Sequence, residues 1–445
     1  MIYILTSKNT IVNFSATNYR SIKDKVTLSF EAENSKDLED YYITEPIPGL
    51  RLLKLGLIYG ANGSGKTTLL KALGFLRTFV IKPLERKTST LNFKPFLFDE
   101  HTQNENTTFE LVFVHNGIKF LYEIAFNNIA VMHEKLYYHQ PNKSLVYERN
   151  TDTSKQLSSI EFGSKIKIKK AHKATLEANT LWNTTVLSGF LKTNIDSKEL
   201  RNATDWFNKV LKAMIVPGAD LRRYVTDRLE SEEINKQHIV QFLRKADFKI
   251  KDISIEKNQQ NLNSEDTELF KFLRHDSVKI QDPTDTNTSE IYFQHSILRY
   301  DKEHSYRLPY REESQGTQRY YQFSGLLALM ITSEVVFPID ELESSLHPDL
   351  LKHFLLVFLV NSKQSQLIAT THHRELLMDR DILRNDVIWF TSKNNDGSMK
   401  LYSLSDFDSS IVRDTTSIFN AYKSGKLGAV PELSDYYLDL NNGEK

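Results

Sequence analysis

The sequence lacks cysteine altogether. Without a thiol the chain has no disulfide bond, no thiolate metal site and no cysteine nucleophile, and this fits a cytoplasmic location. It also lacks an excess of either charge, because lysine plus arginine and aspartate plus glutamate each total 57 in 445 residues. The chain therefore has no overall basic field of the kind that would indicate DNA as its main partner, although a local basic patch could still bind DNA.

Long hydrophobic runs are missing as well. The longest apolar stretch, 323–333, is far below the roughly 18 residues that a membrane-spanning helix needs. The first residues carry too short an apolar piece for a signal peptide. We therefore expect a soluble, cytoplasmic protein with no membrane partner.

What the chain does contain is enough apolar material for folded domains. Apolar residues make up 40% of the sequence and charged residues 26%, a composition that excludes a disordered chain. At roughly 100 to 200 residues per domain, about two to four domains, or one domain with large insertions, are expected. We expect an N-terminal lobe with a β meander (1–165), a mostly helical insertion (166–290) and a C-terminal lobe (291–445).

Local patterns predict the elements of these parts. Residues 11–32 predict a β-hairpin, 52–79 a strand, glycine loop and helix, and 107–148 a strand meander. Ser231 is expected to cap a helix that follows it. The polar stretch 257–290 predicts loops or an exposed hairpin.

Residues 165–170 read KIKIKK and alternate strictly. This alternation predicts a strand with one solvated face. The alternative interpretation is a basic patch that binds nucleic acid.

A glycine loop gives the first chemical signal. The segment GANGSGKT matches the phosphate-loop pattern G-x-x-x-x-G-K-[ST] in full, after an apolar strand and before an apolar-periodic helix. In such a loop the backbone N–H groups and the helix N-terminus face phosphate oxygens, the lysine neutralises the terminal phosphates, and the hydroxyl after it ligates Mg²⁺. We therefore predict a nucleoside triphosphate site built by Gly60, Ala61, Asn62, Gly63, Ser64, Gly65, Lys66, Thr67 and Thr68.

Two acids end a second apolar run, VVFPIDE, at 335–341. An acid at the carboxyl end of a strand beside a phosphate loop holds Mg²⁺ in such enzymes, which gives Asp340, together with Thr67, the role of metal ligand. The neighbouring carboxylate, Glu341, can accept a proton from attacking water. Pro338 has no N–H to donate, so this strand is expected to be irregular or to lack a partner there.

A third apolar run, SQLIATTHH at 365–373, ends in two histidines. A histidine at the carboxyl end of such a strand can reach the γ-phosphate, sense it and orient the attacking water. The spacing does not decide whether His372 or His373 does this.

The stretch ESQGT at 313–317 precedes an apolar helix predicted to run roughly from Gly316 to Glu334. Within one subunit this stretch has no evident role. The helix N-terminus favours an anion, Ser314 can donate a hydroxyl, and Gly316 allows close backbone approach. We predict that the anion is the γ-phosphate held by Lys66 of a second subunit.

The order of these motifs resembles the ATP-binding-cassette ATPases of the structural-maintenance-of-chromosomes, RecF and OLD type. The resemblance implies an α/β P-loop fold with a mixed sheet, a β-rich N-terminal lobe and a helical insertion. It implies Ser314 and Gly316 as the signature, Asp340 as the magnesium acid, Glu341 as the catalytic acid and His372 as the switch histidine. It also implies that Arg20, in NYRSI, approaches bound nucleotide.

Within this class the chain is most similar to stand-alone bacterial anti-phage ATPases, namely the ATPase subunit of the PARIS system and the Rlo-type ATPase. The motifs that carry this are NYRSI, IYGANGSGKT, ESQGTQR, IDELESSLHP and YKSGKLGAVPEL. The resemblance implies an ATP- and Mg²⁺-dependent homodimer, or a higher homo-oligomer, that controls an effector and responds to a phage-encoded trigger. Because only residues 373–445 follow His372, we expect a Toprim-like or other nuclease effector to be a separate chain.

The main alternative is a DNA-repair or DNA-tethering ATPase of the RecF kind, with DNA contacts in 165–173. Zero net charge and the absence of a long coiled coil argue against it. The ATPase half of a membrane transporter and a small-molecule kinase are weaker alternatives, because the chain shows neither a membrane span nor a lid over an acceptor substrate.

Overall fold

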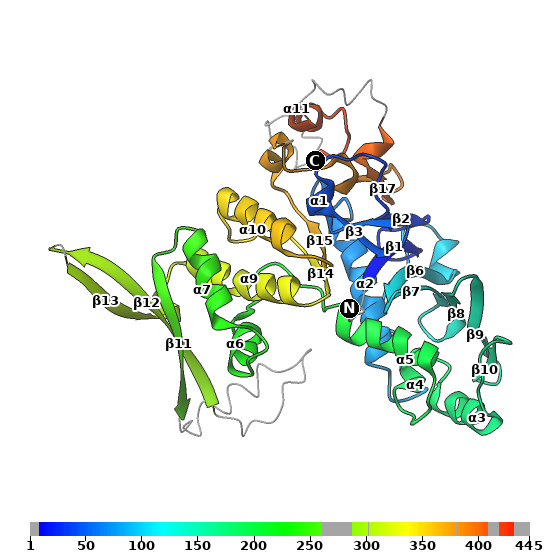
Figure 1. Ribbon diagram of the computed structural model, residues 1–445. Coiled ribbons are helices and arrows are strands. Elements are labelled where there is room, and N and C mark those ends of the chain that lie inside the picture. The colour runs from blue at the N-terminus through cyan, green and yellow to red at the C-terminus, as the bar shows by residue number, and fades with distance from the viewer. Residues whose placement is uncertain (1–8, 260–286, 301, 380, 408–417, 431–445) are drawn as a thin grey trace, which may run out of the picture. The chain divides into compact units, whose positions relative to one another are not determined.

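The computed structural model describes residues 9–259, 287–300, 302–379, 381–407 and 418–430. The chain divides into two compact units, whose elements are labelled in Figure 1. The first unit comprises Met1–Pro217, Met330–Ser344 and Leu356–Lys445, and the second comprises Gly218–Leu329 and Ser345–Leu355.

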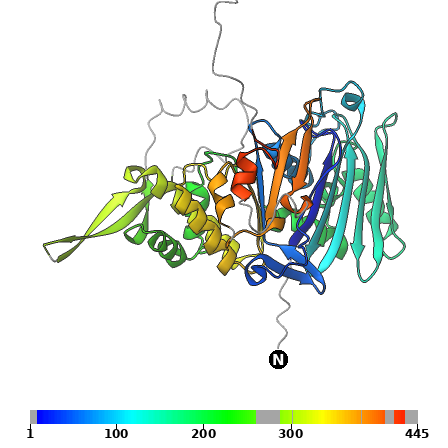
Figure 2. The ribbon, with the colours of Figure 1, turned by 90° about the horizontal axis from the view of Figure 1, so that it is seen from above.

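A seven-stranded antiparallel sheet forms one layer of the first unit, in the order β10-β9-β8-β7-β6-β1-β2. Its strands lie side by side in Figure 2. They span β1 Thr10–Thr17, β2 Val26–Ser29, β6 Thr107–His115, β7 Ile118–Phe126, β8 Val131–His139, β9 Lys143–Asp152 and β10 Leu157–Phe162. This confirms both the hairpin and the meander predicted from alternating apolar residues.

A five-stranded sheet in the order β14-β15-β5-β16-β17 forms the second layer. Four strands are parallel and β17 is antiparallel, so the predicted mixed sheet and P-loop α/β fold class are confirmed. Strands β5, β14 and β15 are buried throughout, as continuous apolar runs require. The bounds are β5 Leu55–Gly60, β14 Val336–Ile339, β15 Gln366–Thr370, β16 Ile388–Lys393 and β17 Met399–Ser403.

Helix α2 (Lys66–Ile81) lies between these two sheets. Its Phe75 packs on Phe109 of β6 and Phe126 of β7, and its other contacts include β5 and β14. The helix therefore fixes the glycine loop that precedes it against both layers. Its predicted position is confirmed.

Pro338 sits on an edge of the five-stranded sheet, because β14 pairs with β15 on one side only. On the other side a short segment makes isolated bridges at Leu211 and Ile215. Ile215 donates its N–H to the Pro338 carbonyl (2.9 Å), so the missing proline N–H faces this incomplete ladder. The predicted irregularity is confirmed.

The remaining elements of the first unit are short. They are α1 Glu39–Tyr42, β3 Ile43–Ile47, β4 Leu50–Leu53, α3 Lys170–Asn179, α4 Val186–Phe190, α5 Lys198–Asp205 and α11 Ile418–Lys423. Residues 165–170 do not form the predicted strand; they are turn and coil leading into α3. Their lysines are exposed, and within the described residues the segment belongs to none of the sheets.

The second unit combines helices with a three-stranded antiparallel sheet ordered β11-β12-β13. Its elements are α6 Arg222–Glu230, α7 Lys236–Lys245, β11 Ile250–Gln259, β12 Asn287–Arg299 and β13 Lys302–Pro309. Helices α9 Gln315–Thr332 and α10 Pro348–Asn361 begin in it and continue into the first unit. The helix predicted near 316–334 is thus confirmed.

Two details of this region differ from prediction. Ser231 follows α6 as its C-cap residue, and the cap of α7 is Asn235, whose side chain accepts from the Gln237 N–H (2.8 Å). Residues 260–286 of the predicted loop or hairpin lie outside the described residues, while both flanks pair as β11 and β12.

The compact units also differ from the three-part division expected from the sequence. Residues that follow position 166 pack onto the first unit, where Trp206 stacks on Phe113 with ring centroids 4.4 Å apart. The boundary at 290 falls within β12, which pairs on both sides. Long-range ring packing and strand pairing therefore join these residues to neighbours that lie on both sides of the expected boundaries.

Candidate nucleotide site

The glycine loop joins β5 to α2 and needs its glycines for two separate reasons. A Cβ on Gly60 would lie 2.6 Å from the Thr391 carbonyl oxygen, so the backbone of β16 excludes any side chain. Gly65 has φ +108°, and a Cβ there would lie 2.4 Å from Met399 Sδ. Beneath the loop, the Ser64 and Thr391 hydroxyls are 2.6 Å apart. Neighbouring strands thus hold the loop close to the sheet.

Lys66 lies folded over this loop. Its Nζ donates to the Gly60 and Ala61 carbonyls at 2.8 and 3.0 Å, and the residue is 6% exposed. Burial lowers the pKa of Lys66, while the charges of Asp340, Glu341 and Glu343 raise it. A buried cation that is held by carbonyls is placed to accept an anionic ligand such as a terminal phosphate.

Asp340 connects three elements at the carboxyl edge of the sheet. Its Oδ1 accepts from the Thr67 hydroxyl at 3.1 Å and from the Thr370 hydroxyl at 2.6 Å. Thr67 is the second residue of α2, Asp340 follows β14 and Thr370 ends β15. The structure therefore brings the two predicted metal ligands together.

These oxygen donors fit Mg²⁺, which prefers one or two protein oxygens plus substrate phosphates and water. Among the described residues no cluster of three or more histidine, cysteine, aspartate or glutamate side chains could form an all-protein metal cage. A site that needs phosphate oxygens to complete its coordination is consistent with that finding.

Glu341 follows Asp340 in a left-handed backbone conformation, with φ +48°. Its N–H donates to the Thr370 hydroxyl at 2.8 Å. One threonine side chain therefore positions both acids, by donating to Asp340 and accepting from Glu341. Sequence reasoning missed Thr370, although its place as a hydroxyl at the end of β15 could have indicated it.

The two histidines separate in the structure. The His372 N–H donates to Glu343 Oε1 at 2.6 Å. Partial burial, followed by the charge of Lys66, lowers the pKa of His372, and the charges of the nearby acids raise it. His373 instead donates its N–H to Thr371, and its ring nitrogen lies 3.9 Å from Glu375.

The ring of His372 therefore experiences the charges of Lys66 and of the acids at the phosphate-loop site. Glu343, which anchors its backbone, was also missed from the sequence. Its position four residues after the end of β14 carried no periodic signal.

Arg20 is placed near the start of α2 because the next residue, Ser21, contacts Thr68. The Ser21 hydroxyl donates to the Thr68 hydroxyl at 3.0 Å, which joins the first hairpin to the start of α2. Arg20 itself is exposed, has φ +53°, and places its guanidinium 5.8 Å from the Tyr19 ring centre.

Ser314 and Gly316 belong to the second unit, whereas the phosphate loop belongs to the first. Ser314 caps α9, because its hydroxyl accepts from the Thr317 N–H at 3.1 Å. A Cβ on Gly316 would meet only the Ser314 hydroxyl, at 3.8 Å. Nothing near Gly316 within the described residues therefore requires a glycine there.

Comparisons with known proteins give a family. A model described as "AAA domain, putative AbiEii toxin, Type IV TA system" matches residues 57–379. A comparison with curated proteins found no match. Solved structures with a similar chain course include the SMC head domain from Thermotoga maritima, with 14% identity and a TM-score of 0.39 over 88% of this chain and 98% of that one.

Two further solved structures are SMC heads bound to parts of ScpA. The SmcHead with the C-winged helix domain of ScpA is 13% identical, with a TM-score of 0.41 over 88% of this chain and 97% of that one. The head with an extended coiled coil, bound to the C-terminal domain of ScpA derived from Pyrococcus furiosus, is 12% identical, with a TM-score of 0.37 over 94% and 99%.

Proposed function

The chain belongs to the family of AAA domains described as putative AbiEii toxin of a type IV toxin–antitoxin system, and we propose that it is an ATP-hydrolysing switch. The observation that carries the proposal is the Asp340 carboxylate, which joins the phosphate-loop hydroxyl of Thr67 to the end of β15. A nucleotide bound by the loop would lie against the acids and His372.

Each residue of the predicted nucleotide site is assigned a role in ATP hydrolysis. Residues 60–68 bind the phosphates through backbone N–H groups, and Lys66 neutralises the terminal phosphate. Thr67 and Asp340 would hold Mg²⁺, which supplies further charge compensation when bound. Glu341 accepts the proton of the attacking water, and His372 orients that water and senses the γ-phosphate. Arg20 approaches the bound nucleotide from the first hairpin.

The test is Glu341→Gln, which keeps the side-chain shape and removes the base. We expect at least a roughly hundredfold lower rate of ATP hydrolysis, the lower end of what general-base catalysis contributes, with ATP binding retained. The control is Glu375→Gln, because Glu375 is an exposed acid beside His373. Wild-type hydrolysis in the Glu341→Gln protein would remove Glu341 from the base role.

We propose further that two chains close around two ATP molecules, with Ser314 and Gly316 of one chain contacting the γ-phosphate bound by the other. The exposed position of Ser314 and the open space around Gly316 support this contact. Hydrolysis or binding of a phage-encoded trigger would then open the dimer, or a larger homo-oligomer, and release a separate effector.

The effector would be a Toprim-like or other nuclease, as in the PARIS and Rlo-type ATPases that the sequence resembles. The family description, which refers to a toxin of a toxin–antitoxin system, supports a function exercised together with a second chain. Copurification with the product of the neighbouring reading frame, using the Glu341→Gln protein, tests this partner. Absence of any such complex with and without ATP would argue against it.

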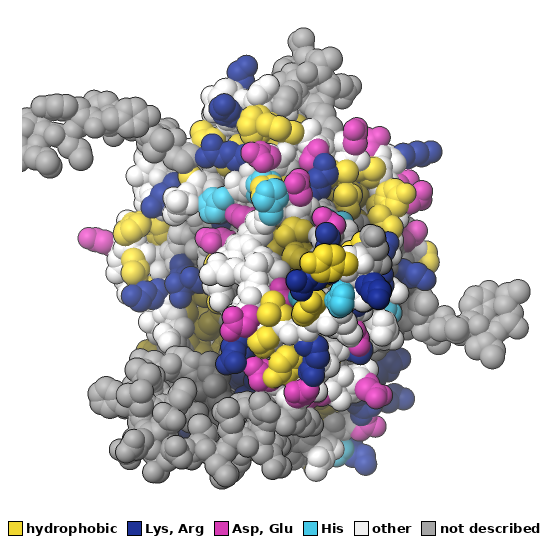
Figure 3. All heavy atoms as spheres, turned by 90° about the vertical axis from the view of Figure 1, so that its left-hand side faces the viewer, with side chains coloured by type: hydrophobic (Ala, Val, Ile, Leu, Met, Phe, Trp, Pro, Cys, Tyr) yellow, Lys and Arg dark blue, Asp and Glu magenta, His cyan; other side chains and the backbone are white. Residues whose placement is uncertain are grey.

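DNA binding of the RecF kind is the second candidate. One observation favours it: Lys165, Lys167, Lys169 and Lys170 are exposed in a non-strand segment. Figure 3 shows basic and acidic side chains intermixed on the face that it draws, so no uniformly basic surface is seen there. Phosphate contacts would make affinity fall steeply with salt, so absence of DNA binding at low salt would remove this candidate.

None of the helices within the described residues combines the length and apolar character needed to cross a membrane.

A further inference from the structure

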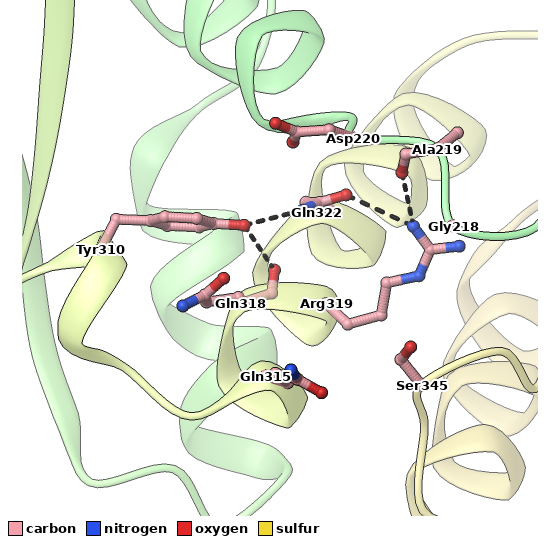
Figure 4. Close-up of a pocket in the computed structure, with 9 residues that line it drawn as sticks. All are labelled: Gly218, Ala219, Asp220, Tyr310, Gln315, Gln318, Arg319, Gln322 and Ser345. Carbon is pink, nitrogen blue, oxygen red and sulfur yellow. Dashed lines mark hydrogen bonds between the residues drawn. The ribbon is translucent and has the colours of Figure 1, made fainter.

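A pocket of about 320 Å³ lies within the second unit, at the start of α9 and next to Ser314 and Gly316. Figure 4 shows its lining: the loop 218–220, Tyr310, the side chain of Ser345, and the first turns of α9. None of the hydrolysis roles proposed above uses these side chains.

Arg319, on α9, is the unusual residue of this pocket. It is 6% exposed, and its Nη1 donates to the Ala219 carbonyl at 2.8 Å and lies 3.4 Å from Gln322 Oε1. Its Nε and Nη2 are buried and have no hydrogen-bond partner in the described part of the chain. Buried donors without an acceptor cost free energy, more so when they carry charge.

The two free donors form one edge of the guanidinium. In a planar guanidinium the Nε–H and one Nη2–H point in the same direction, the geometry that receives two oxygens of a carboxylate or phosphate. The unfilled edge of Arg319 therefore has a defined chemical complement.

The surrounding groups do not supply that complement. Gln322 is already engaged on both ends, because its Oε1 accepts from the Leu221 N–H at 2.9 Å and its Nε2 donates to the Tyr310 hydroxyl at 2.7 Å. Asp220 accepts from the Arg222 N–H at 2.8 Å and is exposed. Burial lowers the pKa of Arg319, and the charge of Asp220 acts against this only as a smaller contribution.

The entrance favours an anion as well. Gln315 and Ser345 are exposed side chains that line the pocket. Gln315 is the first residue of α9, and the N-terminus of an 18-residue helix contributes partial positive charge.

We propose that this pocket binds a small molecule with a carboxylate or phosphate group, whose two oxygens accept from Nε and Nη2 of Arg319. The volume is at the lower end of small-molecule sites, so the ligand is a small metabolite-sized anion. It is distinct from the ATP that the phosphate loop holds.

The test uses full-length protein with Lys66→Ala, so that the phosphate loop does not compete for the probes. Binding of orthophosphate, pyrophosphate and succinate is measured by calorimetry. We expect saturable binding of at least one probe. In the same background Gln315→Glu, which adds a negative charge at an exposed entrance position, should weaken binding about tenfold or more, whereas Gln315→Lys should not weaken it.

Arg319→Gln should abolish binding and Arg319→Lys should weaken it, because lysine has no two-donor edge. The exposed Gln315 pair keeps the test valid if the Arg319 variants fail to fold. The proposal is overturned if none of the three probes binds, or if binding is insensitive to Gln315→Glu. The proposal is also overturned if two results are found together: the Lys66→Ala protein binds no probe, and the only effect of Arg319→Gln is a loss of ATP-dependent dimer formation.

Discussion

At the scale of single residues, one hydroxyl organises the candidate catalytic centre. Thr370 donates to Asp340 and accepts from the N–H of Glu341, so it fixes the carboxylate of one acid and the backbone of the other. The motif positions Lys66, Asp340 and Glu341 were recognisable from sequence because each belongs to a spaced pattern. Thr370 and Glu343 were not, because their roles depend on strands that are distant in the chain.

A buried histidine gives the first prediction at this scale. His115 is 6% exposed, its Nδ1 has no partner within the described residues, and burial lowers its pKa from 6.5 to about 4. The unfolded chain therefore takes up this proton more readily than the folded protein. Folding stability that is present above pH 6.5 should be lost as the pH falls towards 4, by up to about 3 kcal/mol.

The measurement is the free energy of unfolding at pH 7 and pH 4.5. His115→Gln should lose less stability between these pH values than the parent protein does. His304→Gln, at an exposed position of β13, should behave like the parent. Equal acid sensitivity in the parent and the His115→Gln protein would contradict the assignment.

At the scale of elements, the phosphate loop needs a glycine at position 60, whereas helix α2 does not need one at position 74. Gly60 faces the backbone of β16, whereas a Cβ on Gly74, within α2, would meet Met214 Cβ at an ordinary 3.5 Å. Glycine inside a helix costs up to about 1 kcal/mol relative to alanine. The same substitution should therefore have opposite results at the two positions.

We expect Gly74→Ala to raise the free energy of unfolding by up to about 1 kcal/mol with ATP hydrolysis unchanged. Gly60→Ala should destabilise the protein and weaken ATP binding, because a Cβ would lie 2.6 Å from the Thr391 carbonyl. Thermal unfolding and nucleotide titration of both variants check this. A Gly60→Ala protein with parental stability and affinity would show that the loop is less constrained than its contacts indicate.

At the scale of the whole molecule, the proposed site is complete only when two chains meet. Ser314→Arg places a large cation at the exposed start of α9 and should prevent ATP-dependent dimer formation while ATP binding is retained. Ser305→Arg, at an exposed position of β13 in the same unit, is the matched control. Sedimentation of both variants with ATP in the Glu341→Gln background measures the dimer.

A Ser314→Arg protein that still forms the ATP-bound dimer and hydrolyses ATP normally would remove the signature role. Ser314 would then be only the cap of α9, a role that the hydrogen bond from the Thr317 N–H already gives it.

The sequence by itself determined the phosphate loop, the two acids, the hairpin and meander, and the mixed α/β fold, because each depends on short-range spacing and alternation. Only the tertiary structure decided how His372 and His373 differ, which residue caps α7, and that 165–170 is not a strand. It also decided where the compact units divide and left Arg319 with an unfilled edge. These outcomes depend on partners far away in the sequence, whose pairing and burial no local pattern records.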